Sequence, residues 1–69
     1  MGKPRSLRSA LAQGFHVVSI YDKGNKEIRV TLERIFFRKA DDINSFDIWI
    51  NRAYFQRNYP NTFFHYRHS

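Results

Sequence analysis

The chain contains no cysteine, and it has only three glycines and two prolines among 69 residues. Without cysteine it has neither a disulfide framework nor a thiolate metal site. The longest apolar runs, 35–37 and 48–50, are far shorter than the ~20 residues of a membrane-spanning helix. The first residues are too polar for a signal peptide, and no nucleotide-binding glycine motif is present. We therefore expect a cytoplasmic protein with no membrane span, no cofactor and no metal.

Acidic residues are missing from both ends of the chain. All six lie between Asp22 and Asp47, where basic residues balance them, so the net charge of +6 resides in the two terminal segments. The segment 48–69 also holds seven of the twelve aromatic residues. Arginines interleaved with aromatic rings are typical of surfaces that neutralise phosphates and stack on bases. This layout indicates a polyanionic partner.

The length predicts one small domain over residues 6–69, preceded by a flexible basic arm at residues 1–5, and the helix and strand patterns described below predict the α+β class. A chain of this size buries only about 60% of its unfolded surface, so large aromatic rings have to supply much of its core. A homodimer would cover apolar surface that remains exposed, which makes a second copy one expected partner.

Local patterns predict the first elements. Ser6 is a suitable N-cap and Gly14 a suitable C-terminal glycine for a short helix at 6–13. Residues 15–21 are rich in β-branched and aromatic side chains, and residues 27–33 alternate between apolar and polar ones. Between them, Gly24 and Asn25 are turn residues. We expect an antiparallel hairpin, although a helical spacing across 28–36 is an alternative.

The remaining elements are harder to assign. The apolar alternation past residue 33 continues only with a β-bulge near Glu33 and Arg34. Alternation predicts a third strand at 46–51, followed by a helix at 52–58 that Pro60 ends, although a helix also fits 43–58. Residues 62–66 fit an edge strand. The expected fold is an antiparallel sheet of three, or with this segment four, strands with a short helix at 6–13 and another at 52–58.

Trp49 is the central candidate for binding. On the predicted third strand it points away from Phe46, Ile48 and Ile50, just as Arg29 points away from the apolar side chains of its own strand. An exposed tryptophan beside an arginine on a sheet forms either a base-stacking platform or an anchor for a protein partner. The alternative is that a helix covers Trp49 and the ring belongs to the core.

These features favour a small, basic, non-enzymatic protein that binds DNA or RNA through phosphate contacts and aromatic stacking. At the hairpin tip, two lysines and the turn amides also suit one phosphate. The candidate contact residues are Arg5, Arg8, Lys23, Lys26, Arg29, Trp49, Arg52, Arg57 and Arg67.

The second hypothesis is a protein-binding inhibitor or adaptor of the kind found among phage and mobile-element accessory proteins. It would bind a protein partner, an acidic one by charge, through exposed aromatic anchors. The candidate anchors are Trp49, Tyr54, Phe55 and Phe63.

The third hypothesis is a small ribonuclease-type enzyme, because His65, Tyr66, Arg67 and His68 combine acid–base and phosphate-binding groups. Their composition alone defines no catalytic geometry, so we expect no catalytic residue. A fourth hypothesis is peripheral membrane binding through arginine and aromatic side chains.

Overall fold

A computed structural model describes residues 6–34 and 44–68, and the expected basic arm at 1–5 lies outside these ranges. The elements in chain order are α1 (Leu7–Ala12), β1 (His16–Tyr21), β2 (Glu27–Arg34), β3 (Asn44–Asn51), α2 (Arg52–Asn58), α3 (Pro60–Tyr66) and β4 (Arg67–His68). The sheet has the order β3-β2-β1-β4, in which β1, β2 and β3 are antiparallel and β4 runs parallel to β1. The α+β class and the three-stranded antiparallel sheet confirm the predicted fold class.

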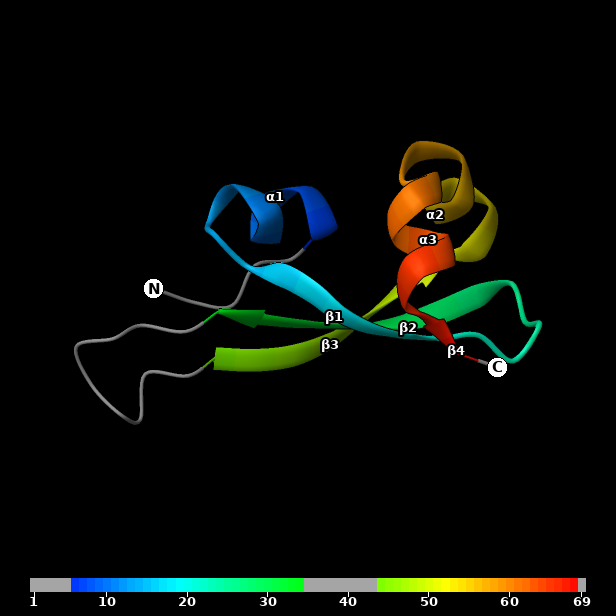
Figure 1. Cartoon of the computed structure of the whole chain (residues 1–69), viewed down its shortest axis with the longest axis horizontal. Coiled ribbons are helices and arrows are strands. Elements are labelled where there is room, and N and C mark those ends of the chain that lie inside the picture. Colours follow the sequence, from blue (N-terminus) through cyan, green and yellow to red (C-terminus); the bar gives the residue numbers. More distant parts are fainter. Residues whose placement is uncertain (1–5, 35–43, 69) are drawn as a thin grey trace.

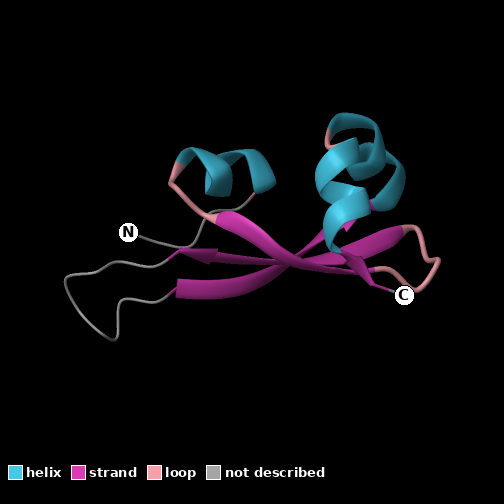
Figure 2. Ribbon diagram, viewed as in Figure 1, coloured by secondary structure: helices cyan, strands magenta, loops and turns pink. Residues whose placement is uncertain are grey.

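All three helices lie on the same face of the sheet, with α1 over one end and α2 and α3 over the other (Figures 1 and 2). Between the sheet and the helices is the hydrophobic core. Its buried members are Leu7, Ala10, Phe15, Val17, Ile20, Ile28, Val30, Leu32, Phe55 and Phe63. The opposite face carries no helix within the described residues (Figure 2), and this uncovered surface is called the open face below.

The ends of α1 and the turn of the hairpin follow from local chemistry. The Ser6 hydroxyl accepts a hydrogen bond from the Ser9 amide at 3.1 Å, and Gly14 ends the helix with a φ of +93°. In the hairpin turn Gly24 has a φ of +86°, and its amide donates to Asp22 Oδ1 at 2.8 Å. These contacts confirm the predicted N-cap, C-terminal glycine and turn. Asn25, the other residue expected in the turn, has a negative φ and so does not share the left-handed conformation of Gly24.

The pairing of β1 with β2 confirms the hairpin and excludes the helical alternative for its second arm. The register runs from His16 opposite Glu33 to Tyr21 opposite Arg29, with a shift between Val17 and Ser19. The irregularity therefore lies in β1. The expected bulge near Glu33 and Arg34 is absent from the β2–β3 ladder, which is regular up to the pair of Arg34 with Asn44.

The segment that follows β3 is helical in two pieces. Asn51 caps α2 through a 2.9 Å hydrogen bond from the Tyr54 amide to its Oδ1, which confirms a strand followed by a helix at 52–58. Pro60 ends α2 as predicted but also begins α3. The expected strand at 62–66 is therefore wrong, because this segment is α3 and turns Phe63 into the core. Among the described residues, only the short β4 occupies that edge of the sheet.

The burial of Phe55 in the core can be tested by a stability measurement. Phe55 is fully buried on α2, so Phe55→Ala is expected to reduce the free energy of unfolding by about 3–5 kcal/mol through lost burial and a residual cavity. Phe64 provides a matched control, since its side chain is 68% exposed on α3. Chemical denaturation of both variants checks the assignment, and equal losses would contradict it.

Candidate nucleic-acid interface

Three candidate binding side chains form one row across the open face. Tyr21 in β1 is the cross-strand partner of Arg29 in β2, and Arg29 is the partner of Trp49 in β3. Side chains that are paired across neighbouring strands point to the same side of a sheet. The row therefore presents an aromatic ring, a guanidinium group and a second aromatic ring, and it is called the Tyr21–Arg29–Trp49 row below.

Trp49 is 60% exposed, so no helix covers it. Its neighbours Ile48 and Ile50 are half-buried against the core, which leaves the indole on the opposite side of β3. Within residues 6–34 and 44–68, no ring or cation–π contact engages the indole. The expected outward direction beside Arg29 is therefore confirmed, while contact of Trp49 with a ligand stays a prediction.

Two cations lie over the ring of Tyr21. The Arg29 guanidinium carbon lies 5.0 Å from the centre of the Tyr21 ring, and Lys23 Nζ lies 5.5 Å from it. A shallow hollow of about 230 Å³ adjoins the Tyr21–Arg29–Trp49 row. Its lining consists of the row together with Lys23, Asn25 and Glu27. The sequence analysis did not select Tyr21, although its place at the end of the first hairpin arm was a usable signal.

Charge is distributed unevenly along the open face. Lys23 and Arg29 lie at or near the hairpin end, where the exposed Glu27 offsets one of their charges. Farther from the hairpin, Asp47 accepts a 2.6 Å hydrogen bond from the Thr31 hydroxyl, and Glu33 belongs to the next pair on the same face. The hairpin end, where the Tyr21–Arg29–Trp49 row lies, is therefore more positive than the end that carries Asp47 and Glu33.

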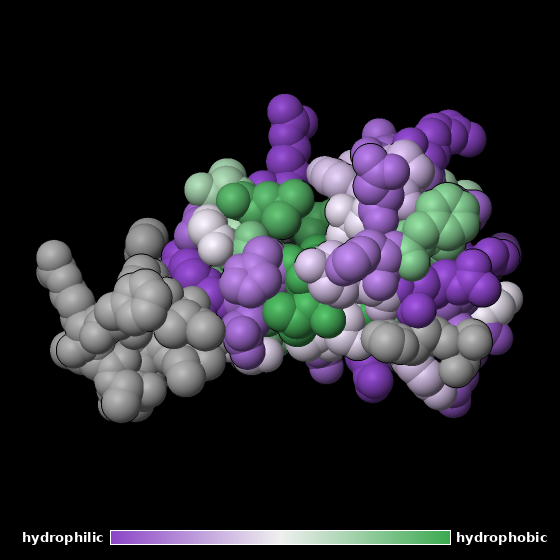
Figure 3. Space-filling view, in the orientation of Figure 1, coloured by the Kyte–Doolittle hydropathy of each residue, from purple (hydrophilic) through white to green (hydrophobic). Residues whose placement is uncertain are grey.

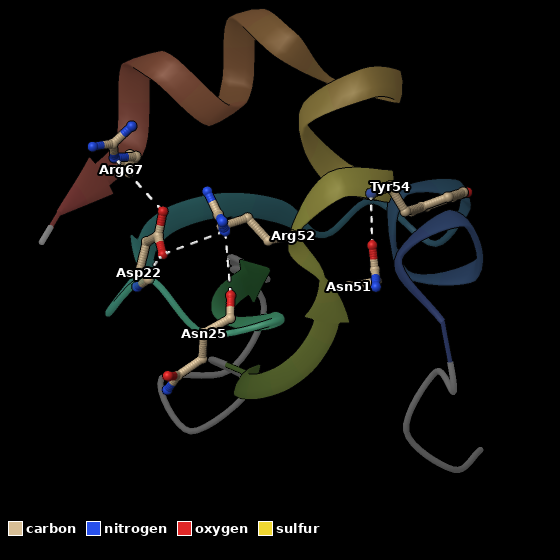
Figure 4. A network of polar contacts seen from close by, with 7 residues as sticks. Asp22, Asn25, Asn51, Arg52, Tyr54 and Arg67 are labelled. Carbon is tan, nitrogen blue, oxygen red and sulfur yellow. Dashed lines mark hydrogen bonds and ion pairs between the residues drawn. The ribbon is translucent and has the colours of Figure 1, made fainter.

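Arg52 and Arg67 gather around Asp22, just beyond the end of β1 (Figure 4). The Asp22 side chain is only 5% exposed, and it lies 4.0 Å from Arg52 Nε and 3.8 Å from Arg67 Nε. Arg52 Nε also donates to the carbonyl oxygen of Asn25 at 3.2 Å. Both arginines thus tie the C-terminal elements to the hairpin, a role that sequence reasoning missed, and their expected phosphate contacts stay predictions.

The remaining cationic candidates are dispersed. Arg8 on α1, Lys26 at the hairpin turn and Arg57 on α2 are all exposed. Arg8 lines a hollow that Trp49 also lines, whereas Lys26 and Arg57 line neither that hollow nor the one beside the Tyr21–Arg29–Trp49 row. Arg5 lies outside the described residues. The structure therefore brings together Lys23, Arg29 and Trp49 from the predicted set. Separately, it brings together Arg8 with Trp49, and Lys23 with Arg52 and Arg67.

Two of the four expected protein-binding anchors are buried, so this expectation was wrong for them. Phe55 and Phe63 are fully buried, with their ring centres 6.3 Å apart, because α2 and α3 turn them toward the sheet. They are core residues and cannot serve as exposed anchors. Tyr54 remains 50% exposed, beside a hollow of about 370 Å³ that Trp49 and Arg8 also line.

The C-terminal histidines lie on different elements. His65 belongs to α3 and packs against Tyr66, with 4.5 Å between the ring centres, whereas His68 belongs to β4. No group of three or more metal-binding side chains occurs in the described part of the chain. Among the helices of the same residues, none is long and apolar enough to cross a membrane.

Comparisons of the chain with models of known families, with curated proteins and with solved structures found no match.

The exposure of Trp49 makes a prediction about the free protein. Trp49→Ala is expected to reduce the free energy of unfolding by less than about 1 kcal/mol, because it removes a surface cross-strand contact and creates no cavity. Intrinsic fluorescence of the unmodified chain, whose single tryptophan is the reporter, should have the emission maximum of a solvated indole. A blue-shifted maximum would show a buried ring.

Proposed function

We propose that this protein binds single-stranded nucleic acid on its open face, without catalysing a reaction. The observation that supports this most directly is the Tyr21–Arg29–Trp49 row, which places an exposed indole beside a cation on an uncovered sheet. Base stacking contributes about 1–3 kcal/mol per base, and cations add phosphate neutralisation. The net charge of +6 strengthens attraction to any polyanion.

The arrangement favours a single strand over a duplex. An indole can stack only on a base whose face is accessible, as in unpaired DNA or RNA. Tyr21 and Trp49 are two strand spacings apart, or about 10 Å, so the two rings would contact different bases of one strand. Arg29 lies between them and can neutralise the phosphate that joins those nucleotides.

Removal of the indole tests the stacking contact. We expect Trp49→Ala to weaken binding of a fluorescent single-stranded oligonucleotide by about 1–3 kcal/mol, because one stacked base is lost. Phe64→Ala is the matched control, since it removes an exposed ring from the helical layer. Fluorescence anisotropy gives both affinities, and an equal effect of the two substitutions would contradict a specific role for Trp49.

The phosphate contact has a separate signature. Arg29→Gln is expected to reduce the slope of log affinity against log salt concentration by about 1, because one fewer condensed counterion is released. Titrations across ionic strength measure this slope. Trp49→Ala serves as the comparison, because it should lower affinity and leave the slope unchanged. A slope unaffected by Arg29→Gln would exclude a direct phosphate contact.

Docking of a protein is the second candidate function, supported by the free edge of β3. This eight-residue strand has no pairing partner beyond β2 in the described part of the chain. Beside it lies the hollow lined by Tyr54, Trp49 and Arg8. An extended segment of a partner, or β3 of a second copy, could add to such an edge. Aromatic docking of this kind would depend little on salt, in contrast to nucleic-acid binding.

A further inference from the structure

We propose that a second site, at the hairpin end of the sheet, binds a terminal phosphate group of the nucleic acid. The site is an open hollow of about 520 Å³ lined by Asp22, Lys23, Gly24, Arg52 and Arg67, and it is called the hairpin pocket. The proposal rests on the proposed function for the identity of the strand that carries the phosphate. The pocket itself is defined by its own residues.

The cations of the hairpin pocket are accessible. The side chains of Arg52 and Arg67 are 41% and 44% exposed, and Lys23 is exposed as well. Asp22, by contrast, is only 5% exposed, and its Oδ1 accepts the Gly24 amide. The carboxylate is therefore shielded from solvent, while the basic groups are not. Figure 4 shows it between Arg52 and Arg67, with a contact to each.

The two guanidinium groups retain donors for a ligand. Their Nε atoms are 3.8–4.0 Å from Asp22, which is too long for a hydrogen bond. Within the described ranges, no hydrogen bond engages the Nη atoms of either arginine. Arginine Nη groups form paired, charge-assisted hydrogen bonds with phosphate oxygens. One phosphate could accept from both arginines and relieve the repulsion between them.

The formal charge of the pocket fits a phosphate at the end of a strand. Lys23, Arg52 and Arg67 supply three positive charges and Asp22 one negative charge, which leaves a net +2. A phosphate monoester carries about −1.5 to −2 at pH 7, whereas a phosphodiester within a strand carries a single negative charge. The monoester found at a phosphorylated 5′ or 3′ end is therefore the better complement.

Lys23 connects the hairpin pocket with the open face. It lines both the hairpin pocket and the hollow beside the Tyr21–Arg29–Trp49 row, and its ammonium group lies 5.5 Å from the Tyr21 ring centre. A strand whose bases stack on the row can thus place its terminal phosphate beyond Lys23. The two sites together would recognise the end of a single strand.

Three oligonucleotides of identical sequence test the proposal: one with a 5′-phosphate, one with a 3′-phosphate and one with neither. We expect one phosphorylated form to bind about tenfold more tightly than the unphosphorylated form, since it gains charge-assisted contacts. Arg67→Gln and Arg52→Gln should remove this difference. Arg57→Gln removes the same charge from α2 and should lower all three affinities alike, which preserves the difference. Equal binding of the three oligonucleotides by the unmodified protein would overturn the proposal.

Asp22→Asn is a second test, which keeps both arginines and so does not depend on variants that could lose binding by unfolding. The amide oxygen can still accept from Gly24, while the net charge of the pocket rises to +3. Binding of the phosphorylated form should therefore tighten several-fold relative to the unphosphorylated one. If the arginines serve only to pair with Asp22, this substitution will lower thermal stability without any gain in phosphate binding.

Inorganic phosphate separates this proposal from the proposed function. Added to the protein alone, it should shift the NMR signals of the Gly24 amide and of the Arg52 and Arg67 Nε–H groups, and leave the Trp49 indole signal in place. These shifts would support the hairpin pocket even if no oligonucleotide bound, which would refute the proposed function. Oligonucleotide binding that depends on Trp49, with no phosphate shifts at these groups, would refute the hairpin pocket alone.

Discussion

The structure depends on a core that lies on only one side of the sheet. Ile28, Val30 and Leu32 alternate along the central strand β2, are all completely buried, and face the helices. Within the described residues, no helix covers the other face (Figure 2). The intervening side chains, Arg29 among them, therefore stay in water. The described side chains of the open face therefore contact one another, as Arg29 does the Tyr21 ring and Thr31 does Asp47, and no helix packs on them.

The elements whose signals are local could be predicted from the sequence. Alternation along β2, a capping Ser6 and a left-handed Gly24 act within a few residues, and each determined its element correctly. The outward direction of Trp49 also follows from a strand period of two. Such features need no knowledge of which segments meet in space, since backbone geometry alone carries them.

The failures concern residues whose environment depends on tertiary contacts. The spacing of Phe55, Tyr59, Phe63 and Tyr66 is helical and was readable, but the β-forming Thr62, Phe63 and Phe64 favoured a strand. Phe55 and Phe63 belong to the core because α2 and α3 turn these two rings toward the sheet, and this packing depends on tertiary contacts that no local pattern reveals. The burial of Asp22 could not be predicted from the sequence, because it requires the end of β1, the start of α2 and β4 to meet in space.

Asp22 links the stability of the fold to the properties of the hairpin pocket. A buried carboxylate is costly unless cations approach it, so Asp22 holds Arg52 at the start of α2 and Arg67 in β4. The same interaction that fastens the C-terminal elements to the hairpin therefore concentrates positive charge there. An anion bound between the arginines would favour the folded state over the unfolded one, because unfolding disperses them. Binding at the hairpin pocket and docking of α2 and α3 on the sheet are consequently expected to be coupled.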